Sequence, residues 1–207
     1  MKINLLVTSL TFIFILSYSA KEIYFSESFE NTTVQESDLM KKFDLDIRNY
    51  LDAFNKGKWN EVMEMIYPKL FDFITRDQMT QAFNQMEDMG MELKTDFNKI
   101  ERISGLTEAE GKEFCRVYYD SDISVKISGN MLDAKDQLTQ GFVEIYGKEN
   151  VKYVGDKKTF NIKAKKSMIA ISEKNFNDWS YIKYNVSQEE LLKQLIPEKA
   201  LEQILKG

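Results

Sequence analysis

Residues 50–71 read YLDAFNKGKWNEVMEMIYPKLF, and this stretch predicts two helices joined at a tight corner. Apolar residues from Phe43 onward recur at helical spacing, and Gly57 follows the last of them, where a glycine commonly ends a helix. A second apolar stripe starts at Trp59 and must end before Pro68, because the residue preceding a proline is pushed out of the α region. The stretch therefore predicts a helix from about Met40 to the Lys-Gly-Lys corner and another directly after it.

The following segment predicts one more helix and then a change to strands. Thr75 and Gln78 in TRDQ form a capping-box pattern, which predicts that a third helix begins there. From Met91 apolar and polar residues alternate, which indicates a strand running toward Ile103. The sequence EFCRVYYDSDISVKIS then predicts two strands with a turn near residues 120–122, because Asp and Ser are typical turn residues.

The remaining chain predicts a helix, further strands and two short final helices. Helical spacing returns over residues 131–146, and Gly155-Asp156 marks a hairpin. Strands are expected in KSMIAIS and DWSYIKY, followed by one helix capped by Ser187 and another that begins at Pro197. This order predicts an α+β fold with N-terminal helices packed on an antiparallel sheet of about five to six strands.

The N-terminus predicts an export signal. Lys2 precedes an apolar run from Leu5 to Leu16, which as a helix covers ~18 Å and is too short for the ~30 Å core of a bilayer. Ser17-Tyr18-Ser19 fits the small residues of a cleavage site. We expect a Sec-type signal peptide over residues 1–19, cleavage near Ser19, and a periplasmic or secreted protein with no membrane span after cleavage. An uncleaved N-terminal anchor is the alternative.

After the signal, residues 20–38 are polar and without periodicity, and they are interpreted as a leader or linker before a single domain over residues 39–207. Asn31 and Asn185 match the glycosylation pattern, which in a chain this rich in Asn is most simply a coincidence. The apolar stripes of the two C-terminal helices predict either a homodimer contact or a cap on the parent domain.

Composition excludes many classes of activity. With 28 basic and 33 acidic residues the chain is acidic, which opposes binding to nucleic acid. It contains no histidine and one cysteine, and it lacks a Walker loop, so most nucleophilic, zinc, redox and nucleotide chemistries are excluded. We expect no catalytic residue, cofactor or metal site. Cys115 alternates with apolar residues and is interpreted as a buried small side chain rather than a reactive thiol.

Two charged patterns favour structural interpretations. Asp44/Asp46 and Asp120/Asp122 have oxygen ligands suited to calcium but lack EF-hand spacing. A cluster of lysines between residues 157 and 166 is most simply interpreted as a solvated face, or as a sheet edge whose charges prevent pairing with another strand. Lys163 and Lys165 are expected to share one face of a strand, so a basic strip is the alternative. The members of the cluster are Lys157, Lys158, Lys163, Lys165 and Lys166.

The stretches YLDAFNKGKWNEVMEMIYP, TRDQM and DWSYIKY resemble the ketosteroid-isomerase-like, nuclear-transport-factor-like superfamily of cystatin-like α+β folds, and most of all its exported bacterial members. The resemblance covers residues 40 to 185, apart from an inserted helix near 131–146. It implies a curved sheet wrapped against the first helices, with an apolar cavity inside. Members of the superfamily include isomerases, dehydratases and modules that only bind ligands or partners.

On this basis we expect an exported, non-catalytic module that binds a small apolar ligand or a protein partner in the cavity. The alternatives are an isomerase or dehydratase that uses a buried carboxylate and a Tyr, and a homodimeric interaction protein. The residues expected to contact the ligand are Tyr50, Phe54, Trp59, Met63 and Tyr67. In each case ordinary packing in the core explains the same residue type.

Overall fold

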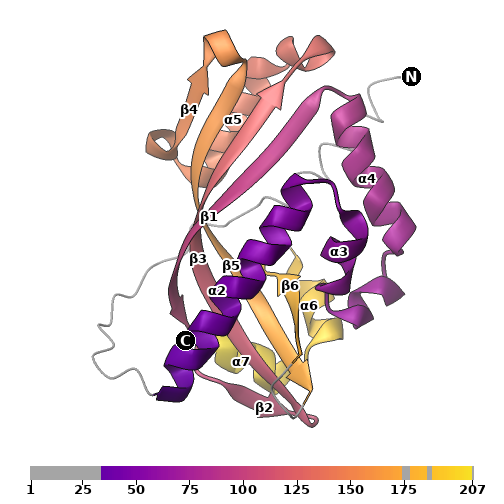
Figure 1. The fold of residues 1–207 in the computed structure, drawn as a ribbon, viewed down its shortest axis with the longest axis vertical. Helices are drawn as coiled ribbons and strands as arrows, with labels where there is room; N and C mark the ends of the chain where they lie inside the picture. Colours follow the sequence, from indigo (N-terminus) through magenta and orange to yellow (C-terminus); the bar gives the residue numbers. More distant parts are fainter. Residues whose placement is uncertain (1–33, 174–177, 186–187, 207) are drawn as a thin grey trace.

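A computed structural model describes residues 34–173, 178–185 and 188–206, which form six α-helices and a six-stranded antiparallel sheet (Figure 1). The expected α+β class, the inserted helix and the short C-terminal helices are confirmed. The helices are α2 (Val34–Asn55), α3 (Trp59–Glu64), α4 (Arg76–Asp88), α5 (Lys135–Tyr146), α6 (Glu189–Leu195) and α7 (Glu198–Lys206). The strands are β1 (Met91–Ile103), β2 (Thr107–Ala109), β3 (Lys112–Ile127), β4 (Val151–Val154), β5 (Thr159–Glu173) and β6 (Trp179–Lys183).

Two long strands, β3 and β5, form the middle of the sheet. They pair from Lys112 opposite Glu173 to Lys126 opposite Thr159. Strand β4 flanks one end of this pair, and β2 and β6 flank the other end. Strand β1 starts beside β3 at the end with β4 and pairs with it as far as Val117. Figure 1 shows the strands crossing at a narrow waist between these ends, as expected when long strands accumulate their twist.

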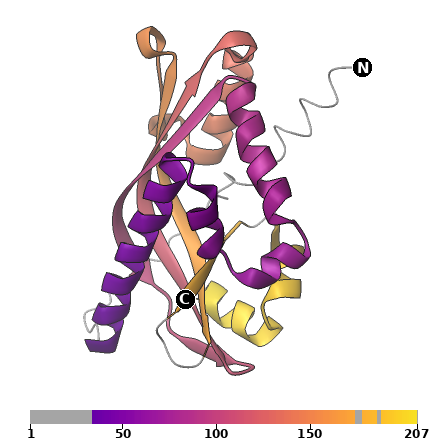
Figure 2. The ribbon, with the colours of Figure 1, turned by 45° about the vertical axis from the view of Figure 1, so that its right-hand side comes forward.

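The end with β2 and β6 has helices on both faces, and we call it the two-sided half. On one face α2 packs through Phe43 and Ile47, and on the other α6 and α7 pack through Leu192 and Ile204. Figure 2 shows α2 and the yellow C-terminal helices on opposite sides of the strands. The apolar residues of α6 and α7 are buried in their own chain, so these two helices cap this face of the domain.

The end with β1 and β4 has an apolar layer on one face, and we call it the one-sided half. Helix α5 packs through Leu138 and Phe142 against Ile123, Phe160 and other apolar side chains of β3 and β5. The opposite face carries exposed charged side chains, among them Asp122, Lys126, Lys163 and Lys165. Lys163 and Lys165 share this face, as the alternation in the sequence predicts.

Helices α2, α3 and α4 pack on one another beside the sheet. Gly57 has φ +65, a value that favours glycine, and it turns the chain from α2 into α3. The predicted capping box at α4 is confirmed, since Thr75 Oγ1 accepts a hydrogen bond from Gln78 N–H and the Gln78 side chain accepts one from Thr75 N–H. A 3-10 helix, η1 (Pro68–Asp72), connects α3 to α4.

The segment between α3 and η1 pairs with the outer edge of β6. Tyr67 N–H donates a hydrogen bond to Tyr181 O at 3.0 Å, and Tyr181 N–H donates one to Met65 O at 2.8 Å. Ile66 lies opposite Tyr181 in this short parallel contact. Residues 65–67 therefore cover the edge of β6 with main-chain partners.

Two predictions about element boundaries are wrong. No turn occurs near residues 120–122, because β3 runs without a break from Lys112 to Ile127 and pairs with β5 throughout. Helix α2 begins at Val34, inside the segment predicted to be a linker. A short strand that was not predicted, β2, lies between β1 and β3 and pairs with the start of β3.

Several predictions concern residues outside the described ranges. These are the signal peptide over residues 1–19 with its cleavage near Ser19, most of the leader, the glycosylation pattern at Asn31 and the helix cap at Ser187. In the part of the chain that the structure describes, no helix combines the length and apolar character needed to cross a bilayer. Asn185 is buried, which agrees with its glycosylation pattern being a coincidence.

Candidate ligand-binding site

Three of the five residues expected to contact a ligand fill the contacts between helices. Met63 is buried among α2, α3 and α4, and Phe54 and Trp59 pack at the edge of the same cluster. The Trp59 ring stacks on Phe83 with centroids 4.6 Å apart, and its Nε1–H donates a hydrogen bond to Asn84. These contacts account for the three side chains as packing residues.

The other two residues lie in different places. Tyr67 is buried on the far face of the two-sided half, in the cluster that includes Leu192 of α6. Tyr50 lies where the cluster beneath α2 meets the cluster among α2, α3 and α4. The structure therefore does not bring the five residues together, and Tyr50 is the one that faces the middle of the sheet.

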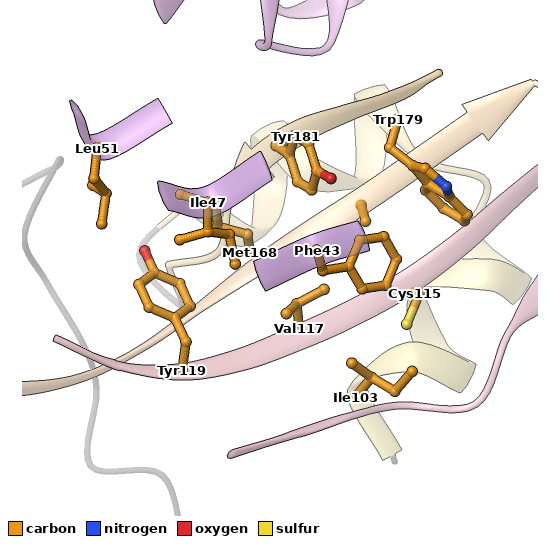
Figure 3. Packing of buried hydrophobic residues seen from close by; sticks show 11 residues of the cluster. Phe43, Ile47, Leu51, Ile103, Cys115, Val117, Tyr119, Met168, Trp179 and Tyr181 are labelled. Atoms are coloured by element: carbon orange, nitrogen blue, oxygen red, sulfur yellow. The ribbon is translucent and has the colours of Figure 1, made fainter. Parts of the chain in front are cut away.

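A group of polar side chains lies in the middle of the face covered by α2, and we call it the central polar cluster. Cross-strand pairing places it: Tyr119 is opposite Lys166, and Lys183 is opposite Met168. Tyr119 and Met168 both pack against α2 (Figure 3). Their cross-strand partners Lys166 and Lys183 therefore project from the same face of the sheet. Its members are Tyr50, Tyr119, Ser121, Tyr146, Lys166 and Lys183.

The cluster separates two apolar regions along the sheet. Phe43, Ile47 and Val117 lie on one side of it, beneath α2, and Ile123 and Phe160 lie on the other, beneath α5. The side chains between them along the strands are the small pair Ser121 and Ala164, which face each other across β3 and β5. Ser121 Oγ is buried, and no group in the described ranges forms a hydrogen bond with it.

The tyrosines of the cluster are neutral donors at ordinary pH. Burial raises the pKa of Tyr50 to about 12. Burial raises the pKa of Tyr119 further, with smaller contributions from the nearby Tyr50 and Tyr146. Considering only the described residues, the hydroxyls of Tyr50 and Tyr119 form no hydrogen bond. These two hydroxyls are therefore available to donate a hydrogen bond to a bound molecule.

The two lysines are partly buried cations. Desolvation lowers the pKa of Lys166 to about 8. Desolvation, followed by repulsion from Lys166, lowers the pKa of Lys183 well below its ordinary value. Over residues 34–173, 178–185 and 188–206, neither ammonium has an ion-pair partner. Two like charges are thus held close together in a protected position.

Sequence reasoning missed both lysines. Lys166 was assigned with Lys163 and Lys165 to a solvated basic cluster, but those two face solvent while Lys166 faces α2. Alternation along the strand indicates the buried position of Lys166, because Lys166 shares its face with Ala164 and Met168. Lys183 alternates with the buried Trp179 and Tyr181 in the same way.

One buried carboxylate faces a tyrosine. Tyr181 O–H donates a hydrogen bond to Asp46 Oδ2 at 2.5 Å, and Lys42 Nζ lies 2.5 Å from Asp46 Oδ1. Tyr181 is on β6 and Asp46 is on α2, so the bond ties the helix to the sheet. Both carboxylate oxygens therefore have donors within a three-residue network.

The side chains of the Asp-x-Asp pairs have partners within the protein. Asp44 pairs with Arg48, with 2.7 Å between Asp44 Oδ1 and Arg48 Nε, whereas Asp46 belongs to the network with Tyr181. On β3, Asp122 accepts a hydrogen bond from Asn98. Within the described segments, no group of three or more Cys, Asp or Glu side chains is placed to hold a metal ion.

Cys115 is fully buried beneath α2, as expected (Figure 3). Burial raises the pKa of its thiol to about 12, so the reactive thiolate form is suppressed. The thiol is therefore a packing group of the core.

The chain matches no protein-family model, and no curated protein is significantly similar to it.

Proposed function

We propose that the chain is an exported, non-catalytic module that binds a small amphipathic molecule, on a fold of the ketosteroid-isomerase-like superfamily that its sequence resembles. The observation that carries the proposal is the central polar cluster. It gathers hydroxyls and ammonium groups from α2, β3, α5, β5 and β6 on one face, between two apolar regions. A few convergent polar groups surrounded by apolar side chains are typical of ligand sites.

Export is supported by the sequence of residues 1–19 alone. It is tested by expressing the full chain in a bacterial host and determining the N-terminus of the protein recovered outside the cytoplasm. A mature chain that begins at Ala20 is expected. Full-length chain retained with the cells would favour the uncleaved anchor.

Ligand binding is tested by native mass spectrometry of the protein purified without detergent, followed by thermal unfolding with a panel of medium-chain amphiphiles. A ligand that binds only the folded chain raises the unfolding temperature in proportion to its occupancy. A co-purified adduct, or a shift with at least one amphiphile, is expected. Absence of both would remove the proposal.

The hydrogen bond between Tyr181 and Asp46 is the observation that favours the enzymatic alternative, since an isomerase or dehydratase needs a buried carboxylate beside a Tyr. Lys42 opposes this role, because both oxygens of the Asp46 carboxylate already have donors, the Lys42 ammonium and the Tyr181 phenol. The alternative gains support if Asp46→Asn abolishes turnover of a ligand that still binds.

A further inference from the structure

We propose that Lys166 and Lys183 together bind the head group of the ligand, and that the ligand is an amphiphile with an anionic oxyacid head, a carboxylate or a phosphate. The inference rests on the proposed function and specifies its ligand class. It is carried by the placement of the two ammonium groups on one protected face without a counter-charge.

The register brings the two side chains to one point. Lys183 on β6 is directly opposite Met168 on β5, and Lys166 lies two residues before Met168 on the same strand. The lysines are therefore diagonal neighbours, with backbones about 7–8 Å apart, a separation that two long side chains bridge readily around one anion. This proximity is the reason why Lys166, after burial, contributes to lowering the pKa of Lys183.

The pair differs from many exposed lysines of the described chain, which have carboxylate partners. Lys42 contacts Asp46, and Lys56 Nζ lies 2.7 Å from Asp52 Oδ2. For Lys183 the perturbing influences are burial and another cation. Partly desolvated cations of like charge are unfavourable unless an anion joins them. A bound oxyanion removes this penalty, because it pairs with both ammonium groups at once.

Donors and apolar surface next to the pair suit such a ligand. Tyr119, directly opposite Lys166, has an unpaired and neutral hydroxyl that can donate to an anion. Phe97 packs on the Tyr119 ring with centroids 6.0 Å apart, and Met65 is partly buried on the same cluster. An amphiphile therefore meets cations and a phenol at its head and apolar side chains along its tail.

The test compares ligands that share one tail and differ in the head. Binding of dodecanoate, dodecyl phosphate and dodecanol to the intact mature protein is measured by calorimetry at pH 7, below the micelle concentrations. Both anions are expected to bind about ten-fold or more tightly than dodecanol, since a charge-assisted hydrogen bond contributes about 1.5–3 kcal/mol. The preferred anion distinguishes a fatty-acid source from a phospholipid source.

Lysine variants assign the effect to the pair. Lys166→Met and Lys183→Met are each expected to reduce the affinity for the anions to that for dodecanol and to leave dodecanol binding unchanged. Lys165→Met is the matched control, because this neighbour faces solvent on the other side of β5, and it is expected to bind as the wild type does. Thermal unfolding checks that each variant is folded.

The outcomes separate the two proposals. If none of the three ligands binds, the proposed function is lost for this class. If dodecanol binds as tightly as the anions, or if the anions bind the Lys166 and Lys183 variants unchanged, the site exists but the lysines do not recognise a head group. The comparison of the three ligands on the wild type shows whether the anionic head group is recognised, even if a variant does not fold.

Discussion

Strands β3 and β5 each pass through two halves of the molecule that are built differently. In the two-sided half, all seven residues of β3 from Glu113 to Tyr119 are buried, because helices cover both faces. In the one-sided half the same strand alternates between buried and exposed residues, as Asp122, Ile123 and Val125 illustrate. The change in the burial pattern therefore reflects whether helices cover one face of the sheet or both, while β3 itself continues as a regular strand.

The boundary between the halves coincides with the candidate site. On β5 the alternating pattern of Lys163 and Lys165 gives way to continuous burial from Ser167 onward. Lys166 lies at this point, and Tyr119 is its partner on β3. At this point the layer formed by α2 ends and the layer formed by α5 begins. Side chains between the two helices are less constrained by packing, so polar groups without hydrogen-bond partners can occur there.

The largest difference between the halves is expected on the face covered by α6 and α7. Phe114→Ala removes a fully buried ring, which is expected to lower the free energy of unfolding by about 3–5 kcal/mol. Asp122→Ala is the matched change on the same strand and the same side of the pleat in the one-sided half, and less than about 0.5 kcal/mol is expected. Urea denaturation measures both, and equal losses would remove the distinction.

The bond between α2 and the two-sided half gives the next largest effect. Tyr181→Phe removes the phenol that donates to the buried Asp46 carboxylate, at an expected cost of about 1.5–3 kcal/mol in the free energy of unfolding. Asp44→Ala, which breaks an exposed pair with Arg48 on the same helix, is expected to cost about 0.3–0.5 kcal/mol. A Tyr181→Phe variant as stable as the wild type would show that Lys42 alone satisfies the carboxylate.

A smaller effect is expected for the helix that packs beside β1 in the one-sided half. Thr75→Ala breaks the capping box of α4 and is expected to cost about 1 kcal/mol. Thr75→Ser keeps a hydroxyl that caps the same N–H and serves as the control. Thermal and urea unfolding measure the two changes. A loss shared equally by Ala and Ser would show that the methyl group matters rather than the cap.

A dependence on pH is expected at the boundary between the halves. The pKa of Lys166 is about 8 in the folded chain and about 10.4 when unfolded, so between these values the unfolded chain binds more protons and the wild type gains stability as pH rises. Lys166→Met is expected to be more stable than the wild type at pH 7, with a difference that shrinks from pH 8 to 10.4.

Urea denaturation at pH 7, 8, 9 and 10 measures this difference. Lys166 has Lys183 on β6 and Tyr119 on β3 as neighbours, and Tyr119 in turn lies near Tyr50 on α2 and Tyr146 on α5. All four residues are retained in both proteins. Their own titrations therefore largely cancel in the comparison. Parallel pH profiles for variant and wild type would contradict the lowered pKa.

Features that depend on neighbouring residues could be predicted from the sequence. The corner at Gly57, the capping box at Thr75 and the helix over residues 131–146 follow from local spacing and chemistry, and all three are present. The turn expected near Asp120 is absent. The change in the sequence pattern at this point has a cause far away in the sequence. Apolar residues stop alternating before it only because α6 and α7, far along the chain, cover that part of β3.

The candidate site depends on the same kind of long-range information. That Lys166 and Lys183 share a face follows from the parity of each strand together with the register of β5 and β6. That this face is protected follows from α2, which packs on it from the other end of the sequence. Neither fact can be inferred from the residues next to each lysine in the sequence. The sequence around Lys166 therefore looks like an ordinary basic surface segment.

The pairing of residues 65–67 with β6 also controls how the sheet meets other chains. An uncovered strand edge is a template on which a second molecule can add a strand, and this is a common route to aggregation. Tyr67 and Met65 occupy the main-chain groups of Tyr181 that such a strand would use. Pro68 follows at once and has no N–H to donate, so the covering segment cannot itself be extended into a further strand. The dipeptide Tyr67-Pro68 thus completes the protection of this edge against self-assembly.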